Sequence, residues 1–420
     1  MMREPADGHA GLLEEVQRRT FGYFWDFAHP VSGLARDRAR DDDDPGDDLV
    51  SIGGSGFGVM ALVVAVERGW ITRRQALDRL LTVLDFLQNA DRFHGIFPHF
   101  MNGATGRSIP FSPLDDGSDI VETAYLMQGL LTAREYFAAP AACETALRQA
   151  IDRLWHEAEW SWHTRGERVL YWHWSPTCEW GMNHPVRGWN ECLIAYVLAA
   201  GAPHHRIDPD VYHQGWASGP DFRNGGSYYG TELPLGPAYG GPLFFAHYSF
   251  LGLDPRGLVD RYADYWTQNV AHVRIHEAHC RHNPNGFAGY GPDCWGLTAS
   301  DDDRGYGAHD PVRDRGVITP TAALASLPYL PEAALRALRH FRFGLGEHIW
   351  GRYGFTDAFN LTSGWYATSY LAIDQGPIVC MIENYRSQLL WRLFMGAPEV
   401  RRGLRRLGFS SPALEGAGSA

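Results

Sequence analysis

Helix-period patterns that follow one another in pairs constrain this fold more than any other feature of the sequence. At 12–27, apolar side chains recur every three or four residues, which is typical of one face of an amphipathic helix. A second pattern covers 54–68, and Thr72 with Gln75 has the form of a capping box that begins a third. Further patterns predict helices at 119–137, 141–159, 188–200, 209–216, 242–251, 255–275, 319–327, 331–345 and 375–394.

Long segments rich in glycine, proline and aromatic residues separate alternate helices, at 91–118, 160–187, 218–241, 276–316 and 348–374. Loops of this length in a compact protein usually carry function. About twelve paired helices with such loops gathered at one end predict an all-α (α/α)6 toroid whose long loops form a funnel-shaped active site. We expect a single catalytic domain at 11–409, an N-terminal extension at 1–10 and a flexible C-terminal tail at 410–420.

The balance of charged residues excludes several classes of partner. The chain contains 37 basic and 49 acidic residues, a formal net charge of −12, and it has no basic tract. Such a chain is poorly suited to nucleic acid, to anionic lipid or to other polyanions, so we expect a neutral ligand. A monomer or weak homodimer is expected.

Two features of the sequence bear on its compartment. No segment reaches the ~18 apolar residues that span a bilayer, so no membrane association is expected. The first residues, MMREPADGHAGLLEEV, lack the apolar core of a secretory signal. We therefore expect a cytoplasmic location for the chain as written, or a periplasmic one if a signal peptide has been removed.

Several familiar chemistries lack their motifs here. The six cysteines form no CxxC or CxxH pair and there is no HExxH, so we predict no metal site. We expect the thiols to be reduced, although Cys280 and Cys294 could form a disulfide in an oxidising compartment. GxSxG and Walker A motifs are absent, and no cofactor is expected. The acidic run at 41–48 lacks the spacing of a calcium loop and is expected to be a solvated loop.

Aromatic residues are abundant, and many of them have polar residues or glycine as sequence neighbours. The chain holds 15 Trp, 19 Tyr and 21 Phe, many of them beside Gly, Asn, Asp or His. Flat rings among hydrogen-bonding groups suit a sugar, although large folds also bury aromatic residues for packing alone. His99, His173 and His309 lie near aromatic residues and suit ligand hydrogen bonding. The residues that we assign to substrate binding are Arg36, Trp189, Asn190, His247, Tyr290 and Trp295.

The densest group of acids outside the 41–48 run consists of Asp115, Asp119 and Glu122, spaced at i, i+4 and i+7. If the helix extends back far enough, the three carboxyls share one face. Their mutual repulsion would then raise at least one pKa and let that group hold a proton near neutral pH. Asp119 and Glu122 alone also fit a capping box, but capping does not require Asp115. We interpret all three as catalytic.

Two more acids stand at predicted helix starts. Glu191 has Trp, Asn and Cys as neighbours, and an apolar environment would raise its pKa and let it act as an acid. The alternative is a structural ion pair with Arg187. Asp374 precedes Gln-Gly-Pro and is either catalytic or a helix cap. We include both acids among the catalytic candidates.

Seven segments carry a resemblance to a known family, in order, from about residue 11 to residue 409. They resemble the glucoamylase-like group that contains glycoside hydrolase family 144. The segments are TFGYFWDFAHPVSGLARDR (20–38), GGSGFGVMALVVAVERGWITR (53–73), DDGSDIVETAYLMQGLL (115–131), GWNECLIAYVLAA (188–200), YGGPLFFAHYSFLGLDPRG (239–257), GYGPDCWGLTASD (289–301) and YLAIDQGPIVCMIENYR (370–386).

This resemblance implies an endo-acting β-1,2-glucanase on an (α/α)6 toroid, without a cofactor, that hydrolyses with inversion and releases sophorose and short sophorooligosaccharides. The acids essential in the family fall on Asp115, Asp119, Glu122 and Glu191, and Asp374 corresponds to a base proposed in a related family. We expect Glu191 to donate the proton, and Asp374 or one of the other three acids to activate water.

Four alternatives stay open at this point. An exo-acting enzyme that releases sophorose, a sugar epimerase and a transferase or phosphorylase are all compatible with such a toroid. A non-catalytic glucan-binding protein would need the aromatic residues but not five converging acids.

Overall fold

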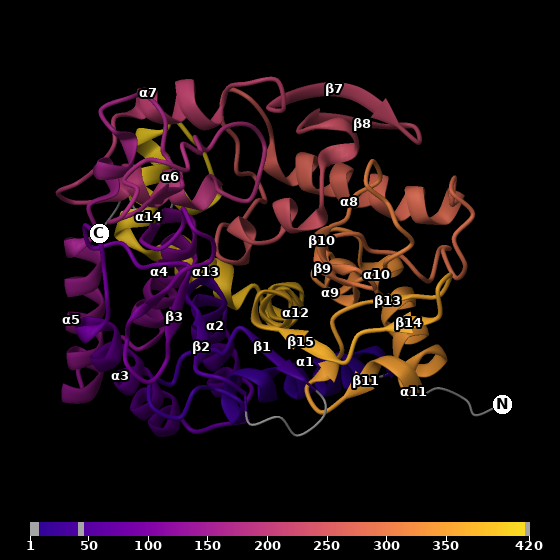
Figure 1. Ribbon diagram of the computed structural model, residues 1–420, viewed down its shortest axis with the longest axis horizontal. Helices are drawn as coiled ribbons and strands as arrows, with labels where there is room; N and C mark the ends of the chain where they lie inside the picture. The colour runs from indigo at the N-terminus through magenta and orange to yellow at the C-terminus, as the bar shows by residue number, and fades with distance from the viewer. Residues whose placement is uncertain (1–7, 41–45, 416–420) are drawn as a thin grey trace.

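Helices dominate the computed structural model, which describes residues 8–40 and 46–415 (Figure 1). The helices are α1 Gly8–Asp26, α2 Ile52–Glu67, α3 Arg73–Asn89, α4 Ile120–Tyr136, α5 Ala142–Glu157, α6 Leu193–Gly201, α7 Pro209–Val211, α8 Tyr265–His282, α9 Pro320–Leu324, α10 Pro331–Arg339, α11 Gly346–Ile349, α12 Ala372–Ser387, α13 Leu389–Gly396, α14 Pro398–Arg406 and α15 Pro412–Glu415.

The strands are short and belong to the connections between helices. They are β1 Arg38–Arg40, β2 Leu49–Ser51, β3 Phe100–Asn102, β4 Ser108–Ile109, β5 Ser118–Asp119, β6 His173–Trp174, β7 Arg223–Tyr228, β8 Thr231–Leu235, β9 Ala299–Asp302, β10 Gly305–Ala308, β11 Trp350–Gly351, β12 Gly354–Phe355, β13 Phe359–Asn360, β14 Trp365–Tyr366 and β15 Ser369–Leu371.

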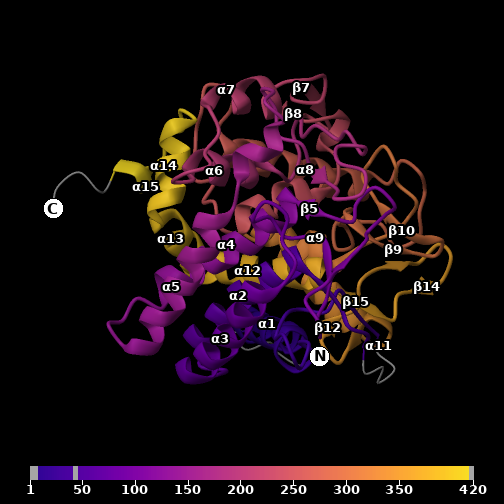
Figure 2. The same ribbon diagram turned by 60° about the vertical axis from the view of Figure 1, so that its left-hand side comes forward.

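The helices form two layers that their burial distinguishes. Helices α9, α12, α2, α4 and α6 pack side by side in that order and are buried on nearly every face. Such all-round burial is typical of a helix inside a large fold. Outside them, α10, α1, α3, α5 and α14 bury one face each, against the inner layer or against each other, and Figure 2 shows α3 and α5 at the edge of the molecule.

Two glycines allow the inner helices α2 and α4 to touch through their backbones. A Cβ on Gly56 would lie 2.1 Å from the carbonyl oxygen of Tyr125, and one on Gly129 would lie 2.1 Å from that of Gly56. Any larger residue would push the helices apart. The glycine at 56, in the glycine-rich start of α2, therefore serves close packing of the two helices.

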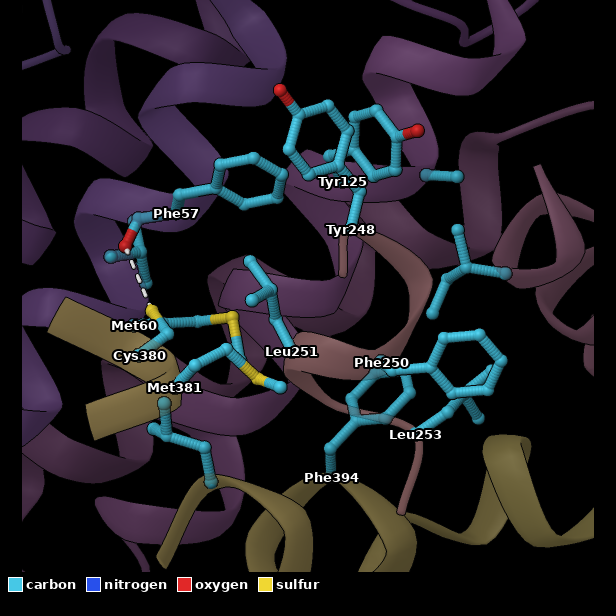
Figure 3. Packing of buried hydrophobic residues seen from close by; sticks show 14 of the residues in the cluster. Phe57, Met60, Tyr125, Tyr248, Phe250, Leu251, Leu253, Cys380, Met381 and Phe394 are labelled. Atoms are coloured by element: carbon cyan, nitrogen blue, oxygen red, sulfur yellow. Dashed lines mark hydrogen bonds between the residues drawn. The ribbon is translucent and has the colours of Figure 1, made fainter. Parts of the chain in front are cut away.

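One large hydrophobic core extends through the molecule, and Figure 3 shows the part of it where α2, α4, α12 and α13 meet the 248–253 segment. Phe57 packs against the rings of Tyr125 and Tyr248, with ring centroids 5.3 and 5.4 Å apart. In Figure 3 the hydroxyl groups of both tyrosines point away from Met381 and the rest of this cluster. The same two tyrosines therefore form the boundary between the core and the site described below.

Three of the small sheets position site residues. β1 pairs with β15 so that Arg38 lies opposite Leu371, and β2 pairs with β3. β5 pairs with β6, which places Asp119 opposite His173. Segments from four distant parts of the chain are held together in this way.

The structure departs from several predicted helix boundaries. The helix predicted at 188–200 begins only at Leu193, and the one predicted at 255–275 begins at Tyr265. The segment 242–251 forms short 3₁₀ turns instead of an α-helix. The last predicted helix is two helices, because Gln388 adopts a left-handed conformation (φ 61°) between α12 and α13.

Both predicted ends of the domain also differ from the structure. Helix α1 begins at Gly8, inside the expected N-terminal extension. Residues 410–415 are not a tail, because Ser410 exchanges backbone hydrogen bonds with Val259 (2.8 and 3.0 Å) and α15 follows. Most of the acidic run at 41–48 lies outside the described residues; of the rest, Asp48 contacts His29 Nε2 at 3.0 Å.

Within the described ranges, no helix combines the length and the apolarity needed to cross a membrane. All six cysteines are free thiols, and Cys280 and Cys294 are both buried without forming a disulfide.

Candidate active site

A cavity of about 480 Å3 lies where the long loops meet the inner helices. Its walls combine aromatic rings with carboxyl groups, as expected for a sugar site. A wider groove of about 710 Å3 runs along α1, but the carboxyls that line it are not buried. The lining residues of the smaller cavity are Asp37, Arg38, Ser51, His99, Phe100, Phe111, Glu122, Tyr125, Trp172, Glu191, Phe244, Tyr248, Ala299, Tyr306, Leu371 and Ile373.

Glu122 reaches the cavity from the first turn of α4. Its Oε2 accepts a hydrogen bond from the backbone N–H of Gly53 at 2.7 Å. A Cβ on Gly53 would lie 2.5 Å from that same oxygen, so any larger residue there would displace the carboxyl. Burial raises the pKa of Glu122 to about 7, and the charge of Asp119 adds to that rise while His99 opposes it.

Asp119 lies behind the wall of the cavity as the N-cap of α4. Its Oδ1 accepts the backbone N–H groups of Val121 and Glu122, both at 2.9 Å. Its Oδ2 accepts His99 Nδ1 at 3.0 Å and Trp172 Nε1 at 3.1 Å. Burial would raise the pKa of Asp119, but the facing histidines and these hydrogen bonds lower it below its ordinary value. Asp119 therefore caps α4, but the capping box considered from the sequence is incomplete, because Glu122 Oε2 accepts the N–H of Gly53 and not that of Asp119.

Asp115 does not lie on the helix, contrary to our prediction, because α4 begins only at Ile120. It occupies a turn of the preceding loop, where its side chain is buried and its Oδ1 lies 3.1 Å from His173 Nδ1. The β5–β6 pairing brings His173 to this point. The three acids therefore do gather, but through a loop and a strand pair instead of one helix face.

His99 is the positive charge of this cluster. Burial would lower its pKa, but the carboxyls of Glu122, Asp119 and Asp115 raise the pKa of His99 to about 9. Its ring also packs on Phe111, with centroids 4.4 Å apart. The imidazole is therefore protonated at neutral pH.

Glu191 lies in the turn before α6, on the wall of the same cavity. Burial raises the pKa of Glu191 to about 7, as the sequence predicted. Its backbone carbonyl accepts the Ser249 hydroxyl, which fixes the turn. Arg187 does not pair with it; that guanidinium donates to Gln214 O at 2.7 Å and Ser218 Oγ at 3.1 Å.

Asp374 is buried one residue beyond Ile373, which lines the cavity. It lies inside the first turn of α12, and its side chain does not cap the helix. Its carboxyl interacts electrostatically with that of Asp357, which accepts the backbone N–H of Asp301 at 2.7 Å. Burial, together with Asp357, raises the pKa of Asp374, so this pair of carboxyls retains a proton.

One group in the described part of the chain has the spacing of a metal site. His99, Asp115 and Asp119 each offer a ligand atom, all within 4.8 Å of one another. However, N–H groups already occupy both oxygens of Asp119, and a metal ion would have to displace the proton of His99. We assign no metal to the group.

Three aromatic residues predicted to contact sugar are instead part of the packing. Trp189 and Trp295 are completely or almost completely buried, and Trp295 Nε1 donates to Ala333 O at 3.3 Å. Tyr290 donates its hydroxyl hydrogen to Asp314 at 2.7 Å, away from the cavity. Flanking glycines made these rings look exposed, but they lie in turns that the fold covers.

The other predicted binding residues are also structural. Arg36 donates to the carbonyls of Asp47 (2.9 Å) and Phe27 (3.0 Å). Asn190 holds the turn before α6 by accepting the backbone N–H of Cys192 at 3.0 Å. His247 is buried against Ser326, with Nε2 3.0 Å from the hydroxyl oxygen.

Several residues that line the cavity were not predicted from the sequence. Asp37 and Arg38 border the cavity next to the predicted Arg36, and no motif distinguished them. Phe111 and Tyr306 each expose 56% of their surface although they are large aromatic residues. The only available signal was their position in long loops at 91–118 and 276–316, which were predicted to carry function.

Comparisons with known proteins agree on one group. Residues 183–398 match the model of the Glycoamylase family, described as "Putative glucoamylase". The chain is 52% identical to an endo-β-1,2-glucanase from Chitinophaga pinensis, solved with sophorotriose and glucose, over 97% of this chain and 99% of that one, with a TM-score of 0.94.

A curated relative is the exo β-1,2-glucooligosaccharide sophorohydrolase (non-reducing end) of Parabacteroides distasonis. It is 45% identical over 94% of this chain, which spans 57% of that relative's length. At 12% identity, an endo-β-1,2-glucanase from Talaromyces funiculosus shares the fold with a TM-score of 0.61, over 91% of this chain and 87% of that one.

Proposed function

We propose that this chain, which belongs to the glucoamylase-like Glycoamylase family, is a glycoside hydrolase that cleaves β-1,2-glucan internally and releases sophorose and short sophorooligosaccharides. The observation that carries the proposal is that Glu122 and Glu191 line one aromatic-walled cavity, each with a pKa of about 7. Two such carboxyls can exchange protons with a substrate near neutral pH.

The surroundings of the two carboxyls differ and suggest their roles. His99 faces Glu122 and favours its ionised form, whereas no cation in the described ranges contributes to the pKa of Glu191. We therefore assign the proton donor to Glu191 and the base to Glu122. Glu122 removes a proton from water while the water oxygen bonds to the anomeric carbon, and Glu191 protonates the glycosidic oxygen as its bond to that carbon breaks.

Asp374 is the other candidate base. It does not line the cavity, and in its pair with Asp357 it already retains a proton. Replacing Asp374 with Asn separates the two assignments. We expect Asp374→Asn to keep most of its turnover and Glu122→Gln to lose it.

The endo mode rests on the Chitinophaga relative, which matches nearly the full length of both chains. The exo mode is the second candidate because the Parabacteroides relative is named for it. The two helix layers agree with an (α/α)6 toroid, which we retain as the proposed fold.

One digest tests both the activity and its stereochemistry. Linear β-1,2-glucan is incubated with the protein, and products are resolved by size and by proton NMR in the first minutes. Endo cleavage gives oligosaccharides of several lengths early, and inversion releases the α-anomer first. Sophorose alone from the first time point would establish the exo mode, initial β-anomer would refute the mechanism, and no cleavage would refute the function.

A further inference from the structure

Asp119 is buried behind the cavity and has no capacity left for a reacting water. A carboxylate accepts about four hydrogen bonds, two on each oxygen. Val121 and Glu122 occupy Oδ1, and His99 and Trp172 occupy Oδ2. Asp119 therefore has to act on the substrate through one of these four partners.

Of these partners, His99 is the one that lines the cavity, bonds Asp119 through its side chain and carries a positive charge. Its side chain keeps 23% of its surface exposed, whereas that of Asp119 is fully buried. Nδ1 is held by Asp119, and the ring is fixed between Phe100 (centroids 4.6 Å apart) and Phe111 (4.4 Å). A protonated imidazole has a second N–H, on Nε2, and Asp119 does not use it.

We propose that His99 is the substrate-contacting cation of this site and that Asp119 is a positioning residue that acts through it. The Nε2–H of His99 donates to a sugar hydroxyl, and the positive charge keeps Glu122 ionised as the base. This inference rests on the proposed function. Glu122, Asp119 and Asp115 together supply the negative charge that keeps the proton on His99, and Asp119 also accepts its Nδ1–H. Asp37 is the other carboxyl facing that ring.

A double-mutant cycle tests the dependence of Asp119 on His99. His99→Asn removes the cation, and Asp119→Asn keeps a good helix cap while removing the acceptor for Nδ1–H. A charge-assisted hydrogen bond corresponds to roughly a 10- to 150-fold effect, so each variant should lower kcat/KM by about that factor. The double variant should fall little further, because both changes remove the same interaction.

The matched control is His94→Asn. His94 also pairs with a carboxylate, Glu159 Oε2 at 3.0 Å, and stacks on Trp162, but it does not line the cavity. This control should keep wild-type kcat/KM. Added imidazole should partly restore His99→Ala, which it could not do if the ring served only to pack the loop.

Three results would overturn the inference. His99→Asn with unchanged kcat/KM would show that the ring does not act on the substrate. Losses that multiply in the double variant would make Asp119 independent of His99. A fall in melting temperature that accounts for the loss, with no rescue by imidazole, would make His99 structural.

If wild-type protein cleaves no β-1,2-glucan, the proposed function fails and His99 is judged by binding alone. Calorimetric titration with sophorotriose then compares wild type with His99→Asn. Weaker binding in the variant supports the contact, and equal binding refutes it.

Discussion

Glu191→Gln is the most direct perturbation of the proposed chemistry, because it keeps the shape of the side chain and removes its acidic proton. At its ordinary pKa of 4.5, roughly 0.3% of this carboxyl would be protonated at pH 7, whereas at about 7 roughly half is. Burial therefore increases the reactive form roughly 150-fold. We expect the variant to lose roughly 10²–10⁴-fold in kcat, with oligosaccharide binding nearly unchanged.

The assay is the release of reducing sugar from linear β-1,2-glucan between pH 5 and 9. Wild-type activity needs Glu122 ionised and Glu191 protonated, so it should fall on the acidic side as Glu122 gains a proton and on the alkaline side as Glu191 loses one. The residual activity of Glu191→Gln should lack the alkaline fall. Glu332→Gln, at an exposed position on α10, is the control. Near-normal turnover by Glu191→Gln would refute the assignment.

Three further predictions follow from individual contacts. Gly53→Ala should lower kcat by at least 10-fold without unfolding the protein, because the new Cβ would lie 2.5 Å from Glu122 Oε2; unchanged turnover would contradict this. Trp295→Ala should reduce the free energy of unfolding by roughly 3–5 kcal/mol, measured in urea, while the folded fraction keeps its affinity for glucan. Burial lowers the pKa of His272 to about 4, so its contribution to stability is complete above pH ~6.5 and is lost as pH falls towards 4. The melting temperature should fall across that window, and less steeply in His272→Gln.

Helix existence could be predicted well from the sequence where periodicity and local chemistry agree. The capping box of Thr72 and Gln75 is present as predicted and begins α3 one residue later. Prediction was poorest where the backbone is shaped by distant contacts. The 242–251 segment has a helical pattern of apolar residues, yet it folds into 3₁₀ turns that pack against α8 and α12.

The acids of the site were found from sequence, but the way in which they meet was not. Asp115 was placed on a helix because of its spacing, whereas it reaches the cluster through a turn opposite His173. Spacing along a helix describes only local geometry, and a loop can bring the same side chains together by another route. The three carboxyls were predicted to gather and they do, but through a loop and a strand pair and not along one helix face.

The prediction of aromatic residues that bind sugar failed for a different physical reason. Composition showed that rings accompany polar groups, but burial depends on what covers a turn, and that is a tertiary property. Trp189 and Trp295 have the glycine neighbours of a binding loop and are nevertheless core residues. Phe111 and Tyr306 also lie in long loops, yet they are exposed at the cavity.

The site combines two groups of acids whose net charge is controlled differently. Around Glu122, the proton on His99 compensates the carboxylates and limits the rise in the pKa of Glu122 to about 7, so roughly half of this carboxyl is ionised at pH 7. Around Asp374, the cation that opposes the rise in pKa is Arg38, which pairs with Asp301, so Asp357 and Asp374 retain a proton instead. A base needs an ionised carboxylate beside the substrate, and the first group provides one on the cavity wall. That difference in charge compensation is the physical reason for placing the base at Glu122.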